Sequence, residues 1–230
     1  MLNLLTWAVV LRPSILAQNW PIPAAILTGA PRLRQAGLAP EVGLLLPNTE
    51  GPSGLVAGLA KTDCDARGAA FGLFLADPFL SIPGAVDALR RQGIGCIANL
   101  PSVEQQDPEF AQQLSDVGLD FAREVEALRQ FQDHGFQVLA VVGDPAAAPA
   151  VAALAPLAVV VLPRVPDFAA GFPSFRKRGA VAREVREALR GAGWGGPLLG
   201  LATASEAAHE TLWPDALDGV VCRPEEREKT

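Results

Sequence analysis

The chain has 230 residues, half of them apolar, and a formal net charge of −6, so it is long enough to bury a large core. We expect no nucleic-acid partner, because binding to a phosphate backbone relies on clustered Lys and Arg. The three cysteines, Cys64, Cys96 and Cys222, lie far apart, which argues against a disulfide framework or a zinc site. We therefore expect a reducing, cytoplasmic location.

The N-terminal segment, residues 1–20, is the only part of the chain that resembles a targeting signal. It lacks a basic start, Arg12 and Pro13 interrupt its apolar run, and that run is too short to span a bilayer. We therefore expect no membrane association and interpret the segment as part of the fold, with a processed leader as the alternative.

Short apolar runs that end abruptly in polar, Pro or Gly residues follow along the chain, as is typical of buried parallel strands. Eight such runs cover residues 22–28, 42–48, 71–76, 94–99, 136–142, 157–162, 197–202 and 217–222. Helical patterns separate most of them, at residues 32–37, 54–59, 81–91, 107–117, 120–133, 181–189 and 205–212.

This eightfold alternation predicts a TIM-type (β/α)8 barrel, formed by residues 1–230 as a single domain. The alternative is an open doubly wound sheet, whose usual glycine-rich phosphate loop is missing from the sequence. The barrel would lack its last helix, because only the charged tail of residues 223–230 follows the last strand. We expect residues 4–11 to form an N-terminal helix that fills this gap beside the first and last strands.

In such a barrel the reactive groups stand at the C-terminal ends of the strands. The polar residues at these ends are Thr28, Asn48, Asp77, Asn99, Asp144, Arg164, Thr203 and Arg223. A ring of these groups suits a small anionic substrate, with Mg²⁺ held by Asp77 or Asp144. The alternative interpretation is that both aspartates, each followed by Pro, are turn or helix-capping residues.

Glu124 is a further candidate because it lies at the margin of the apolar stripe of the helix at 120–133, whereas Glu126 points away. A carboxylate in the first turn of a helix that begins at the functional face is suited to act as an acid or base with a raised pKa. The alternative is a partly exposed Glu favoured by the helix N-terminus.

Other reactive groups give weaker signals. His134 and His209 have no partner at a spacing that indicates metal binding or a triad, and no Ser lies in a nucleophile elbow. The cluster of Arg176, Lys177 and Arg178 is a candidate receptor for a phosphate or carboxylate, or a solvated helix start.

Several motifs occur in the order and at the spacing found in one known family. They are Asp77-Pro78-Phe79, Gly95 with Asn99-Leu100-Pro101-Ser102, and Phe110, Leu114, Gly118 and Phe121 with Glu124-Val125-Glu126, joined by a fainter match at Thr28-Gly29 and Asn48. In these residues the chain resembles the phosphoenolpyruvate hydrolase-like TIM barrels, a family related to the phosphoenolpyruvate mutase and isocitrate lyase group.

The resemblance implies an enzyme that cleaves a C–C or C–P bond in a small 2-oxo acid, or in a phosphorylated or phosphonate relative, to leave a pyruvate enolate. It implies Asp77 as catalytic residue and Mg²⁺ ligand and Glu124 as acid or base. The matching candidates for substrate binding are Thr28, Asn48, Asn99 and Ser102. Arg164 is a further candidate from its place at the end of the sixth run, not from the resemblance. A homodimer is also implied.

The chain departs from the family pattern at three strand ends. The family's glycine-rich end of the first strand is Ala24 to Gly29 here, its histidine after the sixth strand is missing around Leu162 to Arg164, and its His-Gly-Gly-Pro is replaced by residues 201–204. These losses keep open the alternative of a non-catalytic barrel that binds a ligand or another protein.

Overall fold

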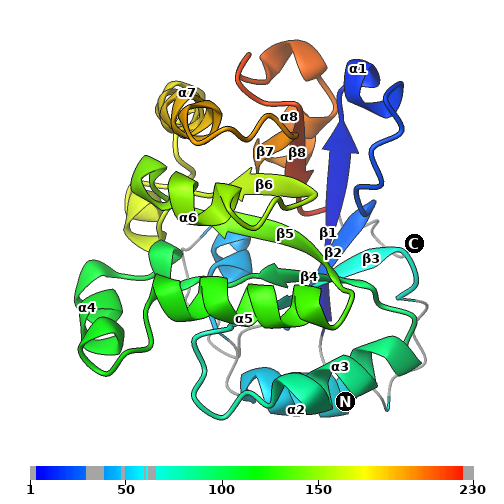
Figure 1. Cartoon of the computed structure of the whole chain (residues 1–230). Helices are drawn as coiled ribbons and strands as arrows, with labels where there is room; N and C mark the ends of the chain where they lie inside the picture. Colours follow the sequence, from blue (N-terminus) through cyan, green and yellow to red (C-terminus); the bar gives the residue numbers. More distant parts are fainter. Residues whose placement is uncertain (1–3, 30–38, 48–49, 60, 62–65, 225–230) are drawn as a thin grey trace, which may run out of the picture.

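The computed structural model describes residues 4–29, 39–47, 50–59, 61 and 66–224, which form a closed eight-stranded barrel of the TIM type (Figure 1). The strands follow one another around the barrel in chain order. They are β1 Leu4–Leu11, β2 Ala25–Gly29, β3 Ala69–Leu73, β4 Cys96–Asn99, β5 Gln137–Val142, β6 Ala158–Val161, β7 Leu198–Leu201 and β8 Gly219–Cys222. Strands β2 to β8 are parallel, and β1 is antiparallel to both of its neighbours, β2 and β8.

Strand β1 shows that the prediction of an N-terminal helix was wrong in secondary structure, although the segment lies beside the first and last parallel strands as expected. Leu4 pairs with Gly29 on β2, and Ala8 pairs with Cys222 on β8. Without β1, both β2 and β8 would present an unpaired edge, which a closed barrel removes. The segment therefore supplies backbone hydrogen bonds rather than a cover for an apolar face.

The apolar run at residues 42–48 was wrongly predicted as a strand. Its described part lies in and just after the 3-10 helix η1, Pro40–Leu44, and β2 pairs directly with β3. Val42, Leu44 and Leu45 are at most 2% exposed and belong to the apolar cluster inside the barrel. A short apolar run does not distinguish a strand from other buried structure. The remaining seven predicted strands are confirmed as β2 to β8.

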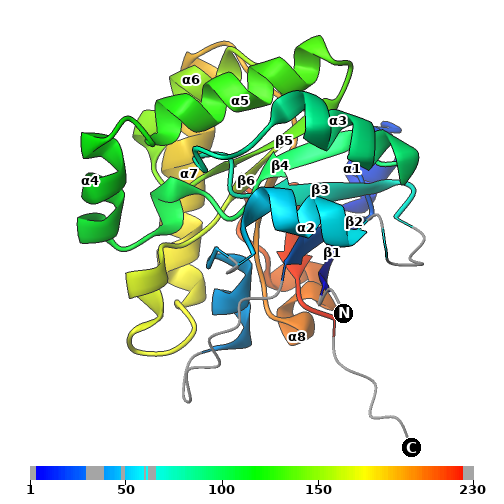
Figure 2. The same ribbon diagram turned by 90° about the horizontal axis from the view of Figure 1, so that it is seen from below.

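Helices surround the barrel (Figure 2). The α-helices are α1 Pro13–Leu16, α2 Gly51–Leu59, α3 Ile82–Arg91, α4 Pro108–Asp116, α5 Phe121–Asp133, α6 Ala148–Ala152, α7 Phe175–Gly191 and α8 Ala204–Ala207. Four further 3-10 helices are η2 Val103–Gln105, η3 Pro145–Ala147, η4 Val165–Phe168 and η5 Glu210–Leu212. The helix predicted at 32–37 lies outside the described residues. Within the described part of the chain, no helix has the length and apolar character needed to cross a membrane.

Alternating strand residues divide the core in two. One set, including Trp7, Val141 and Leu199, fills the barrel, and the other, including Phe71 and Ile97, packs under the helices. This division places polar side chains at the strand ends, where the interior cluster stops.

Arg12 fixes the end of β1 to the segment that precedes β8. Its guanidinium donates hydrogen bonds to the carbonyls of Leu217, Trp213 and Pro214, and its Nη1 lies 2.9 Å from the Glu210 carboxylate. The contact anchors the antiparallel strand at the face opposite the C-terminal ends of the parallel strands.

Candidate active site

Glu124 lies wholly inside the protein at the C-terminal ends of the strands, so the interpretation of a partly exposed side chain was wrong. Asp120 caps helix α5 and directs this first-turn carboxylate toward β4. Ser102 Oγ donates to Glu124 Oε2 at 2.6 Å, Asn99 Nδ2 donates to the same oxygen at 3.1 Å, and the Val103 N–H donates to Oε1 at 3.0 Å. Three predicted site residues, Asn99, Ser102 and Glu124, are therefore brought together.

The Asn99 side chain also hydrogen-bonds to β5 just beyond Ala98 and Leu139, the last backbone pair between β4 and β5. Its Oδ1 accepts from the Val141 N–H at 2.7 Å, and its Nδ2 donates to the Val141 carbonyl at 3.1 Å. Because these hydrogen bonds stay within the chain, Asn99 and Glu124 form a scaffold for the segment after β4. A catalytic role for Glu124 stays a prediction.

Burial raises the pKa of the Glu124 carboxyl from 4.5 to about 8. The hydrogen bonds from Ser102, Asn99 and the Val103 N–H act in the opposite direction, and the charge of Glu104 adds to the increase. No cation among the described residues contributes to this pKa, so the neutral acid is favoured in the fold.

We predict that this carboxyl makes the protein less stable as the pH rises from about 4.5 through about 8. The folded state holds the proton more tightly than the unfolded chain, so the stabilisation is complete below pH 4.5 and is lost as the pH passes the folded pKa. Glu124→Gln removes this contribution to stability. Glu104, whose pKa burial also raises, keeps a contribution of the same sign.

Urea unfolding at pH 5 and 8.5 measures the effect. The loss of unfolding free energy between the two pH values should be smaller in Glu124→Gln than in the wild type, by a few kcal/mol in order of magnitude. The exposed Glu126→Gln serves as control and should keep the wild-type profile. An unchanged profile in Glu124→Gln would contradict the assignment.

A second polar group lies at the ends of β4, β5 and β6. Arg164 Nη2 contacts Asp144 Oδ2 at 3.1 Å, so these two predicted residues are neighbours. Glu104 Oε2 accepts from the Gly143 N–H at 2.8 Å. Burial raises the pKa of Glu104, the Gly143 N–H lowers it, and the nearby charges of Asp144 and Arg164 act in opposite directions. Asp144 Oδ1 also accepts from the Ala146 N–H, so its predicted capping role is confirmed.

Gln105 is the unexpected member of this group. Its side chain is fully buried, and neither its amide nitrogen nor its oxygen has a hydrogen-bond partner among the described residues. Its Nε2 lies 3.2 Å from the position that a Cβ on Gly143 would take, so a larger residue at 143 would crowd the amide. A buried, unpaired amide costs about 1 to 3 kcal/mol, which indicates a group suited to a bound molecule or water.

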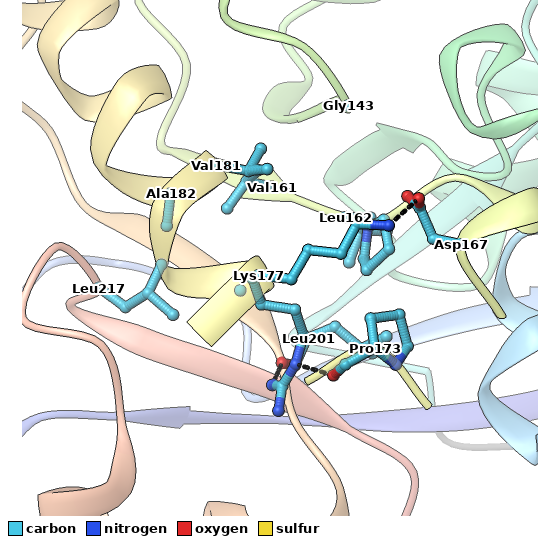
Figure 3. Close-up of a pocket in the computed structure, with 13 residues that line it drawn as sticks. Gly143, Val161, Leu162, Asp167, Pro173, Lys177, Val181, Ala182, Leu201 and Leu217 are labelled. Atoms are coloured by element: carbon cyan, nitrogen blue, oxygen red, sulfur yellow. Dashed lines mark hydrogen bonds and ion pairs between the residues drawn. The ribbon is translucent and has the colours of Figure 1, made fainter. Parts of the chain in front are cut away.

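Beside this group a small, mostly apolar pocket of about 40 Å³ lies between α7 and the ends of β5 to β7 (Figure 3). Lys177 and Asp167 border it and form an ion pair at 2.5 Å. Arg178 also borders it and pairs with Glu206 at 2.5 Å. Both cations are thus engaged with carboxylates, and the volume suits one or a few water molecules rather than a substrate.

The other predicted residues lie apart from this group. The Thr28 hydroxyl accepts from Trp7 Nε1 at 3.1 Å and is buried. Asn48 lies outside the described residues. Thr203 caps helix α8. Asp77 lies in a separate cleft of about 180 Å³ at the ends of β2 to β4.

The donor set at Asp77 does not by itself fit a resident Mg²⁺. Of the described residues lining the cleft, Asp77 is the only carboxylate, and the described chain holds no group of three or more His, Cys, Asp or Glu that could bind a metal. Mg²⁺ is usually held by one or two carboxylates together with several waters and substrate oxygens, so Asp77 would hold it only with a substrate that supplies further ligands.

Sequence reasoning missed Glu104 and Gln105. Their signal was the polar run Glu104-Gln105-Gln106 directly after Ser102, which places three long side chains at the mouth of the barrel. We considered only the residue that closes each strand, whereas Glu104 and Gln105 lie in η2, beyond the end of β4.

The model of a family described as phosphoenolpyruvate hydrolase-like matches residues 33–163, more than half of the chain. The chain belongs to this family. The matched part of this phosphoenolpyruvate hydrolase-like barrel contains Asp77, Glu104, Glu124 and Asp144, and it ends one residue before Arg164. The resemblance seen in the sequence is thereby confirmed.

Other comparisons add little. No curated protein matches the chain. Among solved structures, a nitroalkane oxidase from Streptomyces ansochromogenes aligns with 14% identity and a TM-score of 0.41, over 89% of this chain and 65% of that one. The chain thus spans less than two thirds of that protein, and a likeness at this level carries no argument about function.

Proposed function

We propose that this barrel binds a small 2-oxo acid, or a phosphorylated or phosphonate relative, and cleaves a C–C or C–P bond to leave a pyruvate enolate. The observation that carries the proposal is the grouping of a guanidinium, an unpaired buried amide and a carboxyl with a raised pKa at one end of the barrel, in a chain of this family. These are the groups that the reaction needs.

Arg164 is the proposed binding residue for the substrate carboxylate. Its guanidinium is 42% exposed and already meets the carboxylate of Asp144, so a substrate carboxylate can take up the same kind of contact. The planar fork of N–H groups matches a carboxylate in a way that a Lys ammonium does not.

Gln105 is the proposed donor to the enolate oxygen. Its unpaired amide N–H groups give up no hydrogen bond to another described residue when they bind a ligand, and a donor in a buried site stabilises a developing oxyanion strongly. Glu124 holds Ser102 and Val103, directly before Glu104 and Gln105, and so acts as a positioning residue.

Glu104 is the proposed proton donor. When the bond to C3 breaks, its electron pair stays on C3 and is shared with the oxygen on C2, while the other fragment leaves without it, as carbon dioxide or as a phosphoryl group taken up by water. The protonated form of Glu104 then delivers its proton to C3 and regains one from water. A raised pKa keeps more of this group protonated.

Thermal melting with oxaloacetate, phosphonopyruvate and phosphoenolpyruvate tests the proposal. A ligand at about 100 times its Kd adds about 2.7 kcal/mol, which raises the Tm of a domain of this size by about 5 to 10 °C. We expect this shift for the wild type and for the exposed Arg183→Gln on α7, and its loss in Arg164→Gln. A flat panel, or an equal shift in Arg164→Gln, would contradict the proposal.

A non-catalytic barrel is the second candidate, and the enclosed η1 segment favours it. Val42, Leu44 and Leu45 are nearly unexposed, and the Leu45 carbonyl accepts from Gln106 Nε2 in the segment after β4. The segment thus lies against the C-terminal ends of the strands, the face at which an enzyme of this fold binds substrate. Binding of a ligand from the panel with no product released would favour this candidate over the enzyme.

A further inference from the structure

The cleft that contains Asp77 differs chemically from the Glu104–Arg164 group. It lies at the ends of β2, β3 and β4 and has a volume of about 180 Å³, room for on the order of ten water molecules. Residues from helices α2 and α4 also line it. The cleft is therefore large enough for an organic molecule of several heavy atoms.

A single negative charge faces a mostly apolar wall. Of the described residues lining the cleft, only Asp77 is charged, and the rest include Leu55, Phe74, Pro101 and Phe110. The described part of the wall offers an anion no counter-charge, and the Asp77 carboxylate repels an anion. A small anionic substrate is therefore a poor occupant of this cleft.

The Asp77 carboxylate is held in place by its own loop. Oδ1 accepts from the Phe79 N–H at 2.7 Å, which fixes the orientation of the side chain. Oδ2 lies 3.2 Å from the position that a Cβ on Gly51 would take, at the first residue of α2. Gly51 has a φ of 64° and no side chain, so no side chain at position 51 covers Oδ2.

We infer that this cleft binds an organic ammonium ion, with the charged nitrogen at Asp77 and an alkyl body against the apolar wall. A charge-assisted hydrogen bond to Oδ2 compensates the ammonium for lost water, and the rings of Phe74 and Phe110 add apolar and cation–π contact. A metal ion would use the carboxylate but gain nothing from the apolar wall. This inference does not rest on the proposed function.

Calorimetric titration of the full chain with butylammonium chloride tests the inference, with 1-butanol and butyrate as neutral and anionic analogues. We expect the wild type to bind butylammonium and neither analogue. Asp77→Asn keeps the oxygen that accepts from the Phe79 N–H but loses the charge, so it should bind at least about tenfold more weakly. Asp87→Asn, on an exposed position of α3, is the matched control and should bind as the wild type does.

Phe110→Ala provides a second variant that keeps the charge. Phe110 is 42% exposed, so its truncation should leave the fold intact while weakening butylammonium binding several-fold. The inference is overturned if butylammonium produces no binding heat, if Asp77→Asn or Phe110→Ala binds it as tightly as the wild type, or if 1-butanol binds equally well. Binding of MgCl2 that is lost in Asp77→Asn and blocks butylammonium would show a metal site instead.

Discussion

Replacing Trp7 with alanine is expected to lower the free energy of unfolding by about 4 to 5 kcal/mol. Truncation of a fully buried aromatic side chain costs about 3 to 5 kcal/mol, and the Thr28 hydroxyl would also lose the hydrogen bond from the indole. Trp7 stands on β1, which closes the barrel between β2 and β8, so the damage reaches three strands. Urea unfolding at constant pH measures the change.

The matched control for this experiment is Trp20→Ala. Trp20 is 38% exposed and its indole N–H donates to the nearby Gln18 side chain, so the expected cost is below about 1 kcal/mol. A loss under about 2 kcal/mol in Trp7→Ala would contradict the view that β1 is an integral strand of the barrel.

Glu104→Gln is expected to lower kcat by about 10²- to 10³-fold while changing KM by less than about threefold. Gln keeps the size of the side chain and can still accept from the Gly143 N–H, but it has no proton to deliver to C3. Steady-state assays of pyruvate release measure both constants.

Glu184→Gln, at an exposed position of α7, should retain the wild-type kcat. A Glu104→Gln enzyme with normal kcat would show that another group delivers the proton. In that case the buried Glu124 becomes the candidate acid. A change in the pH dependence of kcat in Glu124→Gln would then support this role.

The parallel part of the fold could be predicted from the sequence because its strands are buried on both faces. Runs such as residues 136–142 and 157–162 are continuously apolar, and helix signals such as Ser81 and Asp120 mark where the next elements begin. Both residues cap their helices and accept hydrogen bonds from the N–H groups of Gly84 and Arg123. Local chemistry alone determines these features.

Strand β1 and helix η1 could not be predicted in the same way, because distant partners decide their structure. Residues 4–11 become a strand only because β2 and β8 offer free edges on either side. The apolar residues around Val42 are buried within the barrel although β2 and β3 leave no room for another strand between them. A local apolar run therefore predicts neither arrangement.

The candidate site was predictable at single positions but not as a network. The helical wheel placed Glu124 at the apolar margin and Glu126 in solvent, and the structure buries the first and exposes the second. The three donors to Glu124 come from the segment after β4, which the wheel cannot show. Gln105 became a candidate only through its unpaired amide, which is a property of packing.

Release of pyruvate from oxaloacetate and phosphonopyruvate by the purified wild-type protein is the most direct test of the central claim. The account predicts turnover with at least one of them, lost in Arg164→Gln and retained in Arg183→Gln. If neither compound yields pyruvate above the uncatalysed rate while one of them still raises the Tm, the barrel binds a ligand without catalysis. If neither reacts or binds, the Glu104–Arg164 group is not a substrate site.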